Sequence, residues 1–470
     1  MPCTTILAGR RATFDGSTMT ARNEDSASGT FNSKKFTVVL PEDQPAVYHS
    51  VISKCEIPLP SDPLRYTAMP NATDEEGIWA AAGVNAKNIS MTATETITSN
   101  ERVLAADPLV KTGIGEEDMV TVTLPYISSA REGVIRLGSL LETYGTYEMN
   151  GIAFQDINEV WWLETVGGHH WIAKRVPDDH YVIMPNSFGI DQFDLKDAFT
   201  KKKDHMCSQD LRSFIADNHL DLTYDDTFNA RLAFGSHTDA DHVYNTPRAW
   251  YAQRYFNPKD TSYTPYSDDI PWSRKPEHKI TVEDVKYVLS SHYQSTPYDC
   301  YAKSGDLSLK GSLRPIGISR NNFLSLVQIR PYVPDAYRTV EWIAFGSNVF
   351  NAFGPLYANI DHAPKYFGNT CGTVTTESFY WANRIIAALA DPHFSECAAD
   401  IGRYRQAVQA EALHIILEYD RKPRTAIMET NEEANAAIEK LVREKTDSLL
   451  DKVLYKASCR MKNGFSRSDG

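Results

Sequence analysis

The chain has few cysteines and no long apolar run, and each absence excludes a class of protein. Its 470 residues include 7 cysteines, scattered at positions 3, 55, 207, 300, 371, 397 and 459 without a Cys-x-x-Cys pair. This odd, dispersed set fits neither a disulfide framework nor a zinc ribbon. No apolar stretch is long enough to cross a membrane, and the start of the chain lacks the apolar centre of a secretion signal. We therefore expect a cytoplasmic protein with no membrane partner.

Positive charge and cofactor motifs are also scarce. The net charge is −13, and the one short basic run, 201–203, is followed by Asp204, so we expect no nucleic-acid partner. No glycine-rich phosphate cradle and no His-Glu-x-x-His helix occurs. The histidine groups at 169–170 and 237–242 could supply donors to a divalent ion, but loops rich in Asp and His are more often solvated. The sequence predicts neither a metal nor another cofactor.

A cysteine close to the start of the chain is the most informative residue that is present. It stands in Met1-Pro2-Cys3-Thr4-Thr5-Ile6-Leu7. If the two preceding residues are removed, Cys3 carries a thiol and a free α-amine, so a nucleophile and a base arrive pre-positioned. Their ordinary pKa values are about 8.5 and about 8, so a nearby cation makes attack feasible near neutral pH. The alternative is that Cys3 is a small apolar residue on a first strand.

A predicted hairpin supplies that cation. Residues 4–9 and 18–22 have the pattern of strands, and Asp15-Gly16-Ser17 that of the turn between them. The returning strand would bring Arg22 and Asp25 beside Cys3. Arg22 would favour the thiolate, and Asp25 would hold and orient an ammonium. A surface ion pair between Arg22 and Asp25 is the simpler interpretation of these two residues.

These motifs resemble the opening of a known enzyme family. Together with several later motifs they are similar to the dipeptidase A family of cysteine peptidases, a branch of the N-terminal-nucleophile hydrolases, and the similarity covers most of the chain. The Cys3 and Arg22-Asn23-x-Asp25 core also resembles bile salt hydrolases and penicillin V acylases, which cleave other amides. The later motifs are Gly83-Val84-Asn85-Ala86-Lys87-Asn88, Ala93-Thr94-Glu95-Thr96, Tyr244-Asn245-Thr246-Pro247-Arg248 and Ile318-Ser319-Arg320.

The resemblance implies three further site residues. Asn186 sits where the acylase relatives place an asparagine that donates to the tetrahedral oxyanion, although it could be a plain turn residue. Arg248 matches a second active-site arginine of those relatives, or it decorates a helix start. Asn85, in Gly83-Val84-Asn85, resembles a further oxyanion asparagine, but Ala86 follows where the relatives usually carry an aromatic residue. The alternative for Asn85 is again a turn residue.

The predicted fold class is α+β, and the resemblance implies a four-layer αββα sandwich of the N-terminal-nucleophile hydrolase type. We expect a hydrolase core over 3–355 and a C-terminal helical region over 356–470 that packs on it. In the first part of the chain the patterns predict strands at 36–40, 78–82 and 89–96, followed by a helix at 118–144 that ends at Gly145. A four-strand antiparallel meander is predicted at 151–154, 160–165, 170–175 and 180–184, followed by helices over 211–292 with an irregular loop at 258–274. The last predicted elements are strands at 316–329 and 339–345 and a helix at 430–456 that begins with a Thr430–Glu433 capping box.

The predicted activity is that of a cysteine dipeptidase that cleaves through a Cys3 acyl-enzyme. We expect dipeptides as substrates and a homo-oligomer as the assembly. Glu95 is the candidate partner for the free α-ammonium of the substrate, with an exposed strand glutamate as the alternative. An acylase or amidase of the bile salt hydrolase or penicillin V acylase type is the alternative enzyme. A noncatalytic regulator resembling the secernins is the alternative from another class, against which Arg22 and Asp25 count.

Overall fold

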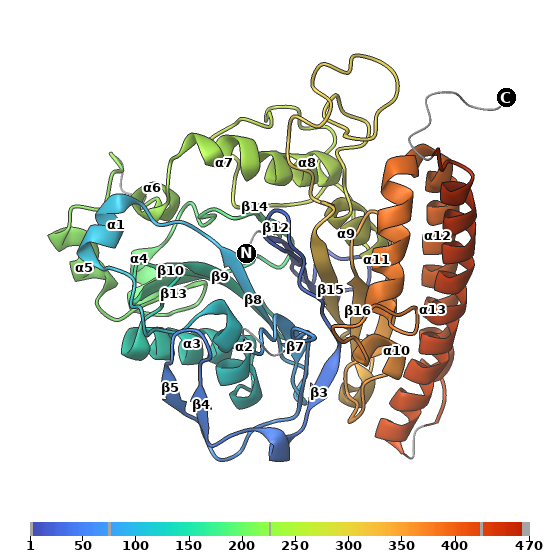
Figure 1. Cartoon of the computed structure of the whole chain (residues 1–470). Coiled ribbons are helices and arrows are strands. Elements are labelled where there is room, and N and C mark those ends of the chain that lie inside the picture. Colours follow the sequence, from blue (N-terminus) through green and yellow to red (C-terminus); the bar gives the residue numbers. More distant parts are fainter. Residues whose placement is uncertain (1–2, 74–76, 225–226, 424–425, 463–470) are drawn as a thin grey trace.

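The computed structural model describes residues 3–73, 77–224, 227–423 and 426–462, and it describes only the backbone of 94 and 95. Two antiparallel sheets dominate it (Figure 1). The larger sheet has the order β14 (Ser273–Arg274), β12 (Tyr181–Met184), β1 (Cys3–Ala8), β2 (Thr18–Asp25), β15 (Asn321–Ile329), β16 (Thr339–Phe345) and β17 (Gly354–Tyr357). The smaller has the order β13 (His205–Cys207), β11 (His170–Arg175), β10 (Val160–Val166), β9 (Asn150–Gln155), β8 (Ser90–Thr96) and β7 (Ala82–Val84).

Thirteen α-helices, four short 3-10 helices and two small two-stranded sheets surround the main sheets in the described residues. One small sheet pairs β3 (Thr37–Val39) with β6 (Tyr66–Ala68), and the other is the hairpin of β4 (Val47–His49) and β5 (Glu56–Pro58). The helices are α1 (Glu101–Ala106), α2 (Glu116–Thr123), α3 (Ala130–Tyr144), α4 (Leu195–Phe199), α5 (Leu211–Asp217), α6 (Ala230–Phe234), α7 (Asp239–Tyr244), α8 (Thr246–Phe256), α9 (Val282–Leu289), α10 (Lys365–Gly368), α11 (Phe379–Ala390), α12 (Phe394–Asp420) and α13 (Ile427–Ser458). Antiparallel sheets with segregated helices confirm the predicted α+β class.

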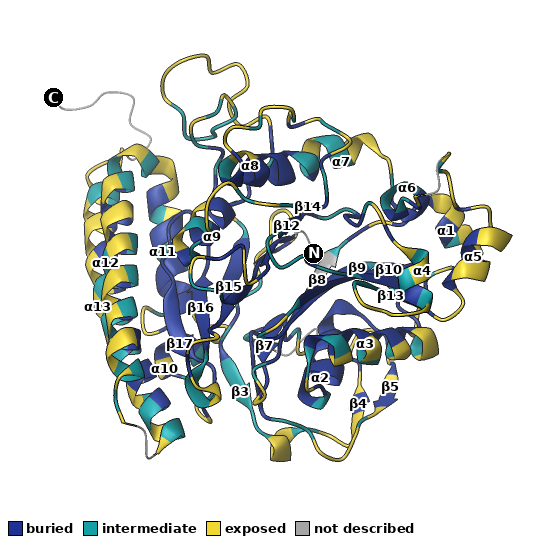
Figure 2. Ribbon diagram, turned by 180° about the vertical axis from the view of Figure 1, so that it is seen from behind, coloured by how far each residue is buried: buried dark blue, intermediate teal, exposed yellow. Residues whose placement is uncertain are grey.

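Apolar side chains form one layer between the sheets and one on each outer face. Trp162 and Ile172 of the smaller sheet meet Leu7 and Val182 of the larger one in the middle layer. The neighbouring Trp161 points the other way, into the layer beneath α2 and α3, because successive strand residues face opposite sides. The helices α8, α9, α11 and α13 cover the outer face of the larger sheet. Figure 2 shows the result, with buried strands between helices whose outer faces are exposed.

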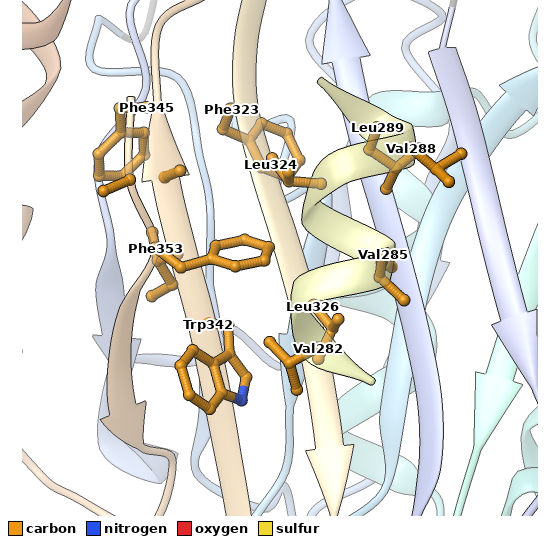
Figure 3. Packing of buried hydrophobic residues seen from close by; sticks show 14 of the residues in the cluster. Val282, Val285, Val288, Leu289, Phe323, Leu324, Leu326, Trp342, Phe345 and Phe353 are labelled. Atoms are coloured by element: carbon orange, nitrogen blue, oxygen red, sulfur yellow. The ribbon is translucent and has the colours of Figure 1, made fainter. Parts of the chain in front are cut away.

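The outer layer of the larger sheet is rich in aromatic residues. Figure 3 shows helix α9, which carries Val285 and Leu289, beside strand β15, which carries Phe323; Trp342 of β16 and Phe353 belong to the same cluster. All five side chains are buried. Fully burying a side chain of this size contributes about 1.5–3 kcal/mol. This layer therefore holds β15 rigidly, and β15 is the strand that pairs with β2.

The β1–β2 hairpin forms as the sequence predicts. Gly16 has φ of 83°, which glycine adopts without strain, and Asp15 accepts hydrogen bonds from the amide and hydroxyl of Ser17 at 3.0 and 2.8 Å. The two strands pair in the register Thr5 opposite Arg22. All residues of both strands are buried, because β1 and β2 lie in the interior of the larger sheet.

Three of the predicted elements need correction. The predicted helix at 118–144 is split into α2 and α3, because Pro125 interrupts it and Ser129 caps α3 by accepting from the amide of Glu132. The predicted strand at 78–82 is irregular except for its last residue, and Trp79 and Ala81 have positive φ. The fourth strand of the predicted meander, β12, leaves the smaller sheet and pairs with β1. The prediction for Gly145 is confirmed, since it ends α3 with φ of 68°.

The later elements differ mainly at their ends. The strand predicted at 316–329 begins at Asn321, and 339–345 is confirmed as β16. The stretch 211–292 holds the short helices α5 to α9, with the predicted irregular loop before β14. The last helix begins at Ile427, so the capping box is wrong: the hydroxyl of Thr430 donates to the carbonyl of Ala426 inside the first turn.

The C-terminal helices form a layer of their own beside the larger sheet. The long helices α12 and α13 lie side by side, and α13 also packs on α11 and β17 (Figure 1). The strand β17 runs across residue 355, where the sequence places the end of the core. The division into 3–355 and 356–470 stays a prediction. No helix in the described part of the chain is both long and apolar enough to cross a membrane.

Candidate active site

The thiol of Cys3 lies in contact with Arg22. In the β1–β2 ladder Cys3 is opposite Glu24 and Thr5 is opposite Arg22, so Cys3, Arg22 and Glu24 share one face of the sheet. The Nη2 atom of Arg22 donates to Sγ of Cys3 at 3.0 Å, and neither residue is exposed. A guanidinium in contact with a sulfur favours its thiolate form. The hairpin therefore places a charged activator beside the candidate nucleophile.

Arg22 is held in place by partners on three sides. Its Nη1 donates to the carbonyl of Ala81 at 3.1 Å, and its Nη2 donates to Oε1 of Glu116 at 2.7 Å. The Oε2 atom of Glu24 lies 3.6 Å from the same Nη2. Both carboxylates are buried. The arginine thus has one fixed orientation, and its positive charge is balanced without contact with solvent.

A second buried cation completes this cluster. The Nζ atom of Lys34 lies 3.0 Å from Oε1 of Glu24 and donates to the carbonyl of Trp79 at 3.2 Å. Burial lowers the pKa of Lys34, and the neighbouring Glu24 opposes that shift. The sequence analysis missed Glu24, Glu116 and Lys34. The strand period of two could have identified Glu24, which is two residues after Arg22, but no sequence pattern points to the other two residues.

The backbone of Cys3 is bound from the side of β12 and α8. Asn186 follows β12, and its Oδ1 accepts from the backbone nitrogen of Cys3 at 3.1 Å and from Nη2 of Arg248 at 2.8 Å. Arg248, fully buried on α8, also donates to the hydroxyl of Thr4 at 2.9 Å and to the carbonyl of Cys3. The structure therefore brings Cys3, Arg22, Asn186 and Arg248 together. The catalytic roles of these residues stay predictions.

Asp25 lies at the end of β2, and its side chain binds residues other than Cys3. Its carboxylate accepts hydrogen bonds from Arg314 and Asn321. Cys3 is paired with Glu24, so Asp25 lies one residue beyond that pair, on the alternate face of the strand. Among the hydrogen bonds of the described residues, none joins Asp25 to Cys3. Its predicted role as the group that orients the amine stays a prediction.

The side-chain amide of Asn85 is bound to groups other than Cys3, and its expected role as an oxyanion donor beside Asn186 stays a prediction. Its Nδ2 donates to the carbonyls of Leu124 and Ile127 at 2.9 and 2.8 Å. An amide nitrogen has two hydrogens, and both are used here. Asn85 therefore holds the turn after β7 against the segment between α2 and α3.

Glu95 can be placed only by its backbone. It belongs to β8 and pairs with Gly151 of β9, next to an irregularity in the ladder between Thr92 and Glu95. Its side chain lies outside what the structure describes. The role of Glu95 in binding the substrate ammonium stays a prediction.

The two histidine groups have carboxylate partners. His169 and His170 each place Nδ1 beside Asp107, at 2.8 and 2.7 Å, and His242 lies 2.9 Å from Asp268. Over the described ranges of the chain, no group of three or more His, Cys, Asp or Glu side chains could hold a metal ion. None of the described cysteines forms a disulfide.

A buried thiol in contact with an arginine, on an interior strand of an antiparallel sheet, has the composition of a cysteine peptidase site. Comparison with known proteins supports that class. A family model described as Peptidase family C69 matches residues 2–407, and the chain belongs to this family. The resemblance to the dipeptidase A family is thereby confirmed.

Three relatives show how far the similarity extends. A protein named "Dipeptidase" from Bifidobacterium longum (strain NCC 2705) is 51% identical over an alignment of 532 residues that covers 100% of both chains. A "Probable dipeptidase A" from Streptococcus pyogenes serotype M18 is 52% identical, with 99% of this chain and 98% of the relative covered. A "Probable dipeptidase B" from Lactococcus lactis subsp. lactis (strain IL1403) is 44% identical with the same coverage.

Proposed function

We propose that the protein is a cysteine dipeptidase in which Cys3, freed of Met1 and Pro2, is the N-terminal nucleophile. The observation that carries this proposal is the 3.0 Å contact from Nη2 of Arg22 to Sγ of Cys3. The names of the relatives support a dipeptide substrate. The two stacked sheets with helices on both outer faces support a sandwich of the N-terminal-nucleophile hydrolase type.

The reaction runs through a thioester. The Sγ atom of Cys3 attacks the scissile carbonyl carbon, a carbon–sulfur bond forms, and the carbonyl oxygen becomes an oxyanion. The α-amine of Cys3 takes the thiol proton and delivers it to the leaving nitrogen, so the carbon–nitrogen bond breaks and the second amino acid departs. Water, deprotonated by the same amine, then attacks the thioester and releases the first amino acid. Cys3 regains its proton, and no cofactor is needed.

The groups around Cys3 take separate parts in this reaction. Arg22 stabilises the thiolate, because its guanidinium contacts the sulfur in a site without exposed surface. Asn186 supplies an oxyanion donor, a contribution worth roughly 3 kcal/mol in comparable sites. Arg248 binds both the carbonyl of Cys3 and Oδ1 of Asn186, and so fixes the distance between them. Asp25 orients the amine from the neighbouring strand.

Recognition of the substrate requires a group for its free α-ammonium. Glu95 is the proposed partner, from its place on β8 in the sheet that faces β1. A carboxylate lost from such a contact costs about 2–5 kcal/mol when the contact is desolvated. We also propose a cytoplasmic location, a homo-oligomeric assembly, and a hydrolase core over 3–355 with a helical region over 356–470.

A small panel of free and N-acetylated dipeptides tests the function. We expect the wild-type protein to hydrolyse free dipeptides, with kcat/KM at least tens of times higher than for the acetylated forms, and Cys3→Ala to be inactive. Cys371→Ala, which removes an exposed free thiol, is the matched control and should retain wild-type rates. Equal kcat/KM for both kinds of substrate would favour an acylase instead. An unchanged preference in Glu95→Gln would remove Glu95 alone from the proposal.

A further inference from the structure

Asn245, at the junction of α7 and α8, uses its whole side-chain amide on the groups around Cys3. Its Nδ2 donates to the carbonyl of Asn186 at 2.9 Å and to Oδ1 of Asp241 at 2.6 Å. Its Oδ1 accepts from the backbone nitrogen of Asn186 at 3.2 Å and from Nη2 of Arg248 at 2.5 Å. Both hydrogens and both lone pairs of the amide are therefore engaged. The residue is 5% exposed.

Two of these bonds hold the backbone of Asn186 just beyond the end of the β12 ladder. The pairing of β12 with β1 ends at Met184, and its pairing with β14 ends at Val182. Asn186 is two residues beyond the last pair of the β1–β12 ladder. Asn245 binds both the amide and the carbonyl of Asn186, as the next strand of a ladder would. Asn245 thus helps to fix the backbone from which the side chain of Asn186 reaches Cys3.

The same amide also controls Arg248. Arg248 lies three residues after Asn245, on the first turn of α8. A single nitrogen of its guanidinium, Nη2, donates to Oδ1 of Asn245 and to Oδ1 of Asn186. Arg248 reaches the carbonyl of Cys3, and Asn186 reaches its nitrogen. A shift of Asn245 would therefore move both groups relative to the nucleophile at once.

Asp241 is one of the partners that set which way the amide of Asn245 faces. A carboxylate only accepts hydrogen bonds when ionised, so it requires the nitrogen of Asn245 on its side and leaves the oxygen for Arg248. Asp241 lies on the wall of a cavity of about 660 Å³, together with Pro185, Ser187 and Thr246. This cavity borders the segment that carries Asn186.

We propose that Asn245 is a positioning residue that sets Asn186 and Arg248 against the backbone of Cys3, with Asp241 as its anchor. This inference rests on the proposed function of Cys3. Displacements of about 1 Å at a reacting group can cost about 10²-fold in rate, so the loss of this anchor lowers kcat. The contact of Arg22 with the thiol comes from another strand and does not depend on Asn245.

The test exchanges donor and acceptor between the two anchor residues. Asn245→Asp keeps size and acceptors but sets two carboxylates against each other and removes the donor to Asn186. We expect kcat to fall about 10- to 100-fold, KM to stay within about 3-fold, and the pH profile of thiol alkylation to be unchanged. In the double variant D241N/N245D the hydrogen bond between 241 and 245 returns with reversed polarity and the net charge is unchanged. It still lacks the donor to the carbonyl of Asn186, so it should regain only part of the lost kcat.

Asn229→Asp is the matched control, because Asn229 borders the same cavity and caps α6 through its oxygen, which aspartate retains. It should keep the wild-type kcat. A wild-type kcat in Asn245→Asp would overturn the inference, and so would a loss accompanied by a shifted alkylation profile. If Asn245→Asp does not fold, the double variant D241N/N245D provides the test. A folded double variant with a measurable kcat below that of the wild type supports the inference. A folded double variant without activity contradicts it. A wild-type protein that cleaves no dipeptide would refute the proposed function instead.

Discussion

Arg22 and Cys3 meet across the β1–β2 ladder, with Nη2 of the arginine 3.0 Å from the sulfur and neither side chain exposed. They are 19 residues apart in the sequence. A hairpin turn brings them together, and the outer packing of β15 holds the second strand in place. The relationship explains why a thiol inside the protein is a suitable nucleophile: its counter-charge is built into the adjacent strand.

Replacing that counter-charge should change the titration of the thiol. We expect Arg22→Leu to move the alkylation profile of Cys3 to higher pH by about one unit or more, since one pKa unit corresponds to 1.36 kcal/mol of interaction with the charged form. Alkylation rates followed by mass spectrometry over pH 5–10 measure the shift.

A buried arginine elsewhere in the chain provides the comparison. Arg330→Leu removes a guanidinium that pairs with Asp420 at 2.6 Å and should leave the profile where it is in the wild-type protein. A profile that stays put in folded Arg22→Leu would mean that another group activates the thiol.

The two asparagines of the sequence analysis should behave differently. Asn186→Ala should lower kcat by about 10²–10³, the usual loss for one oxyanion donor. Asn85→Ala should leave kcat within a few-fold but lower the free energy of unfolding by about 1–3 kcal/mol, because the carbonyls of Leu124 and Ile127 lose their donor. Steady-state kinetics and urea unfolding of both variants make the comparison. A 10²-fold loss of kcat in stable Asn85→Ala would instead support its predicted role as an oxyanion donor.

Asp25 and Arg314 form an ion pair with little exposed surface, and its loss should lower the free energy of unfolding. Asp25→Ala leaves the guanidinium of Arg314 uncompensated, so we expect the free energy of unfolding to fall by about 3–5 kcal/mol. The double variant Asp25→Ala/Arg314→Met removes both charges and should recover much of that loss in urea unfolding. If Asp25 also orients the amine, the double variant regains stability without regaining kcat. An Asp25→Ala protein as stable as the wild type would contradict the structural account.

Local chemistry explains which parts of the fold could be predicted from the sequence. The hairpin depends on Asp15, Gly16 and Ser17 alone, and the end of α3 on Gly145, so neighbouring residues suffice for both. The break between α2 and α3 could also have been found, because Pro125 interrupts the helical pattern. By contrast, the apolar pattern of β12 gives no information about which sheet it joins. Its place beside β1 depends on packing across the whole molecule.

The residues of the site, too, differ in whether neighbouring sequence or distant packing brings them to Cys3. Arg22 could be predicted because strand pairing is local, whereas Glu116 reaches the site from a helix 94 residues away. Asn85 was expected in the site from a motif, but the structure shows that its amide satisfies two carbonyls of a neighbouring segment. Asn245 lies in the motif Tyr244-Asn245-Thr246-Pro247-Arg248, but this motif does not indicate its contacts, because they are made to Asn186 beyond the end of the β12 ladder.

Glu341 should make stability depend on pH. It is fully buried, and burial raises its pKa to about 7, although the hydroxyl of Thr67 opposes the shift. In the unfolded chain the pKa of Glu341 is about 4.5. Between pH 4.5 and about 7 the folded protein therefore keeps Glu341 protonated while the unfolded chain does not, so the free energy of unfolding falls as the pH rises through this range. Glu341→Gln removes this titrating group. The free energy of unfolding of the variant minus that of the wild type should therefore be about 2–3 kcal/mol larger at pH 8 than at pH 5.

Urea unfolding at the two pH values measures this difference. Glu433→Gln, at an exposed position of α13, serves as the control and should show the same pH dependence as the wild-type protein. A difference between wild type and Glu341→Gln that is equal at pH 5 and pH 8 would contradict the burial argument.

The measurement that tests the central claim most directly is the intact mass of fully active enzyme, taken before and during turnover of a dipeptide. The account predicts a chain that begins at Cys3, and during turnover a fraction heavier by one acyl residue, with that residue on the peptide that contains Cys3. Full activity in a preparation that quantitatively retains Met1 or Pro2 would contradict the free-amine mechanism.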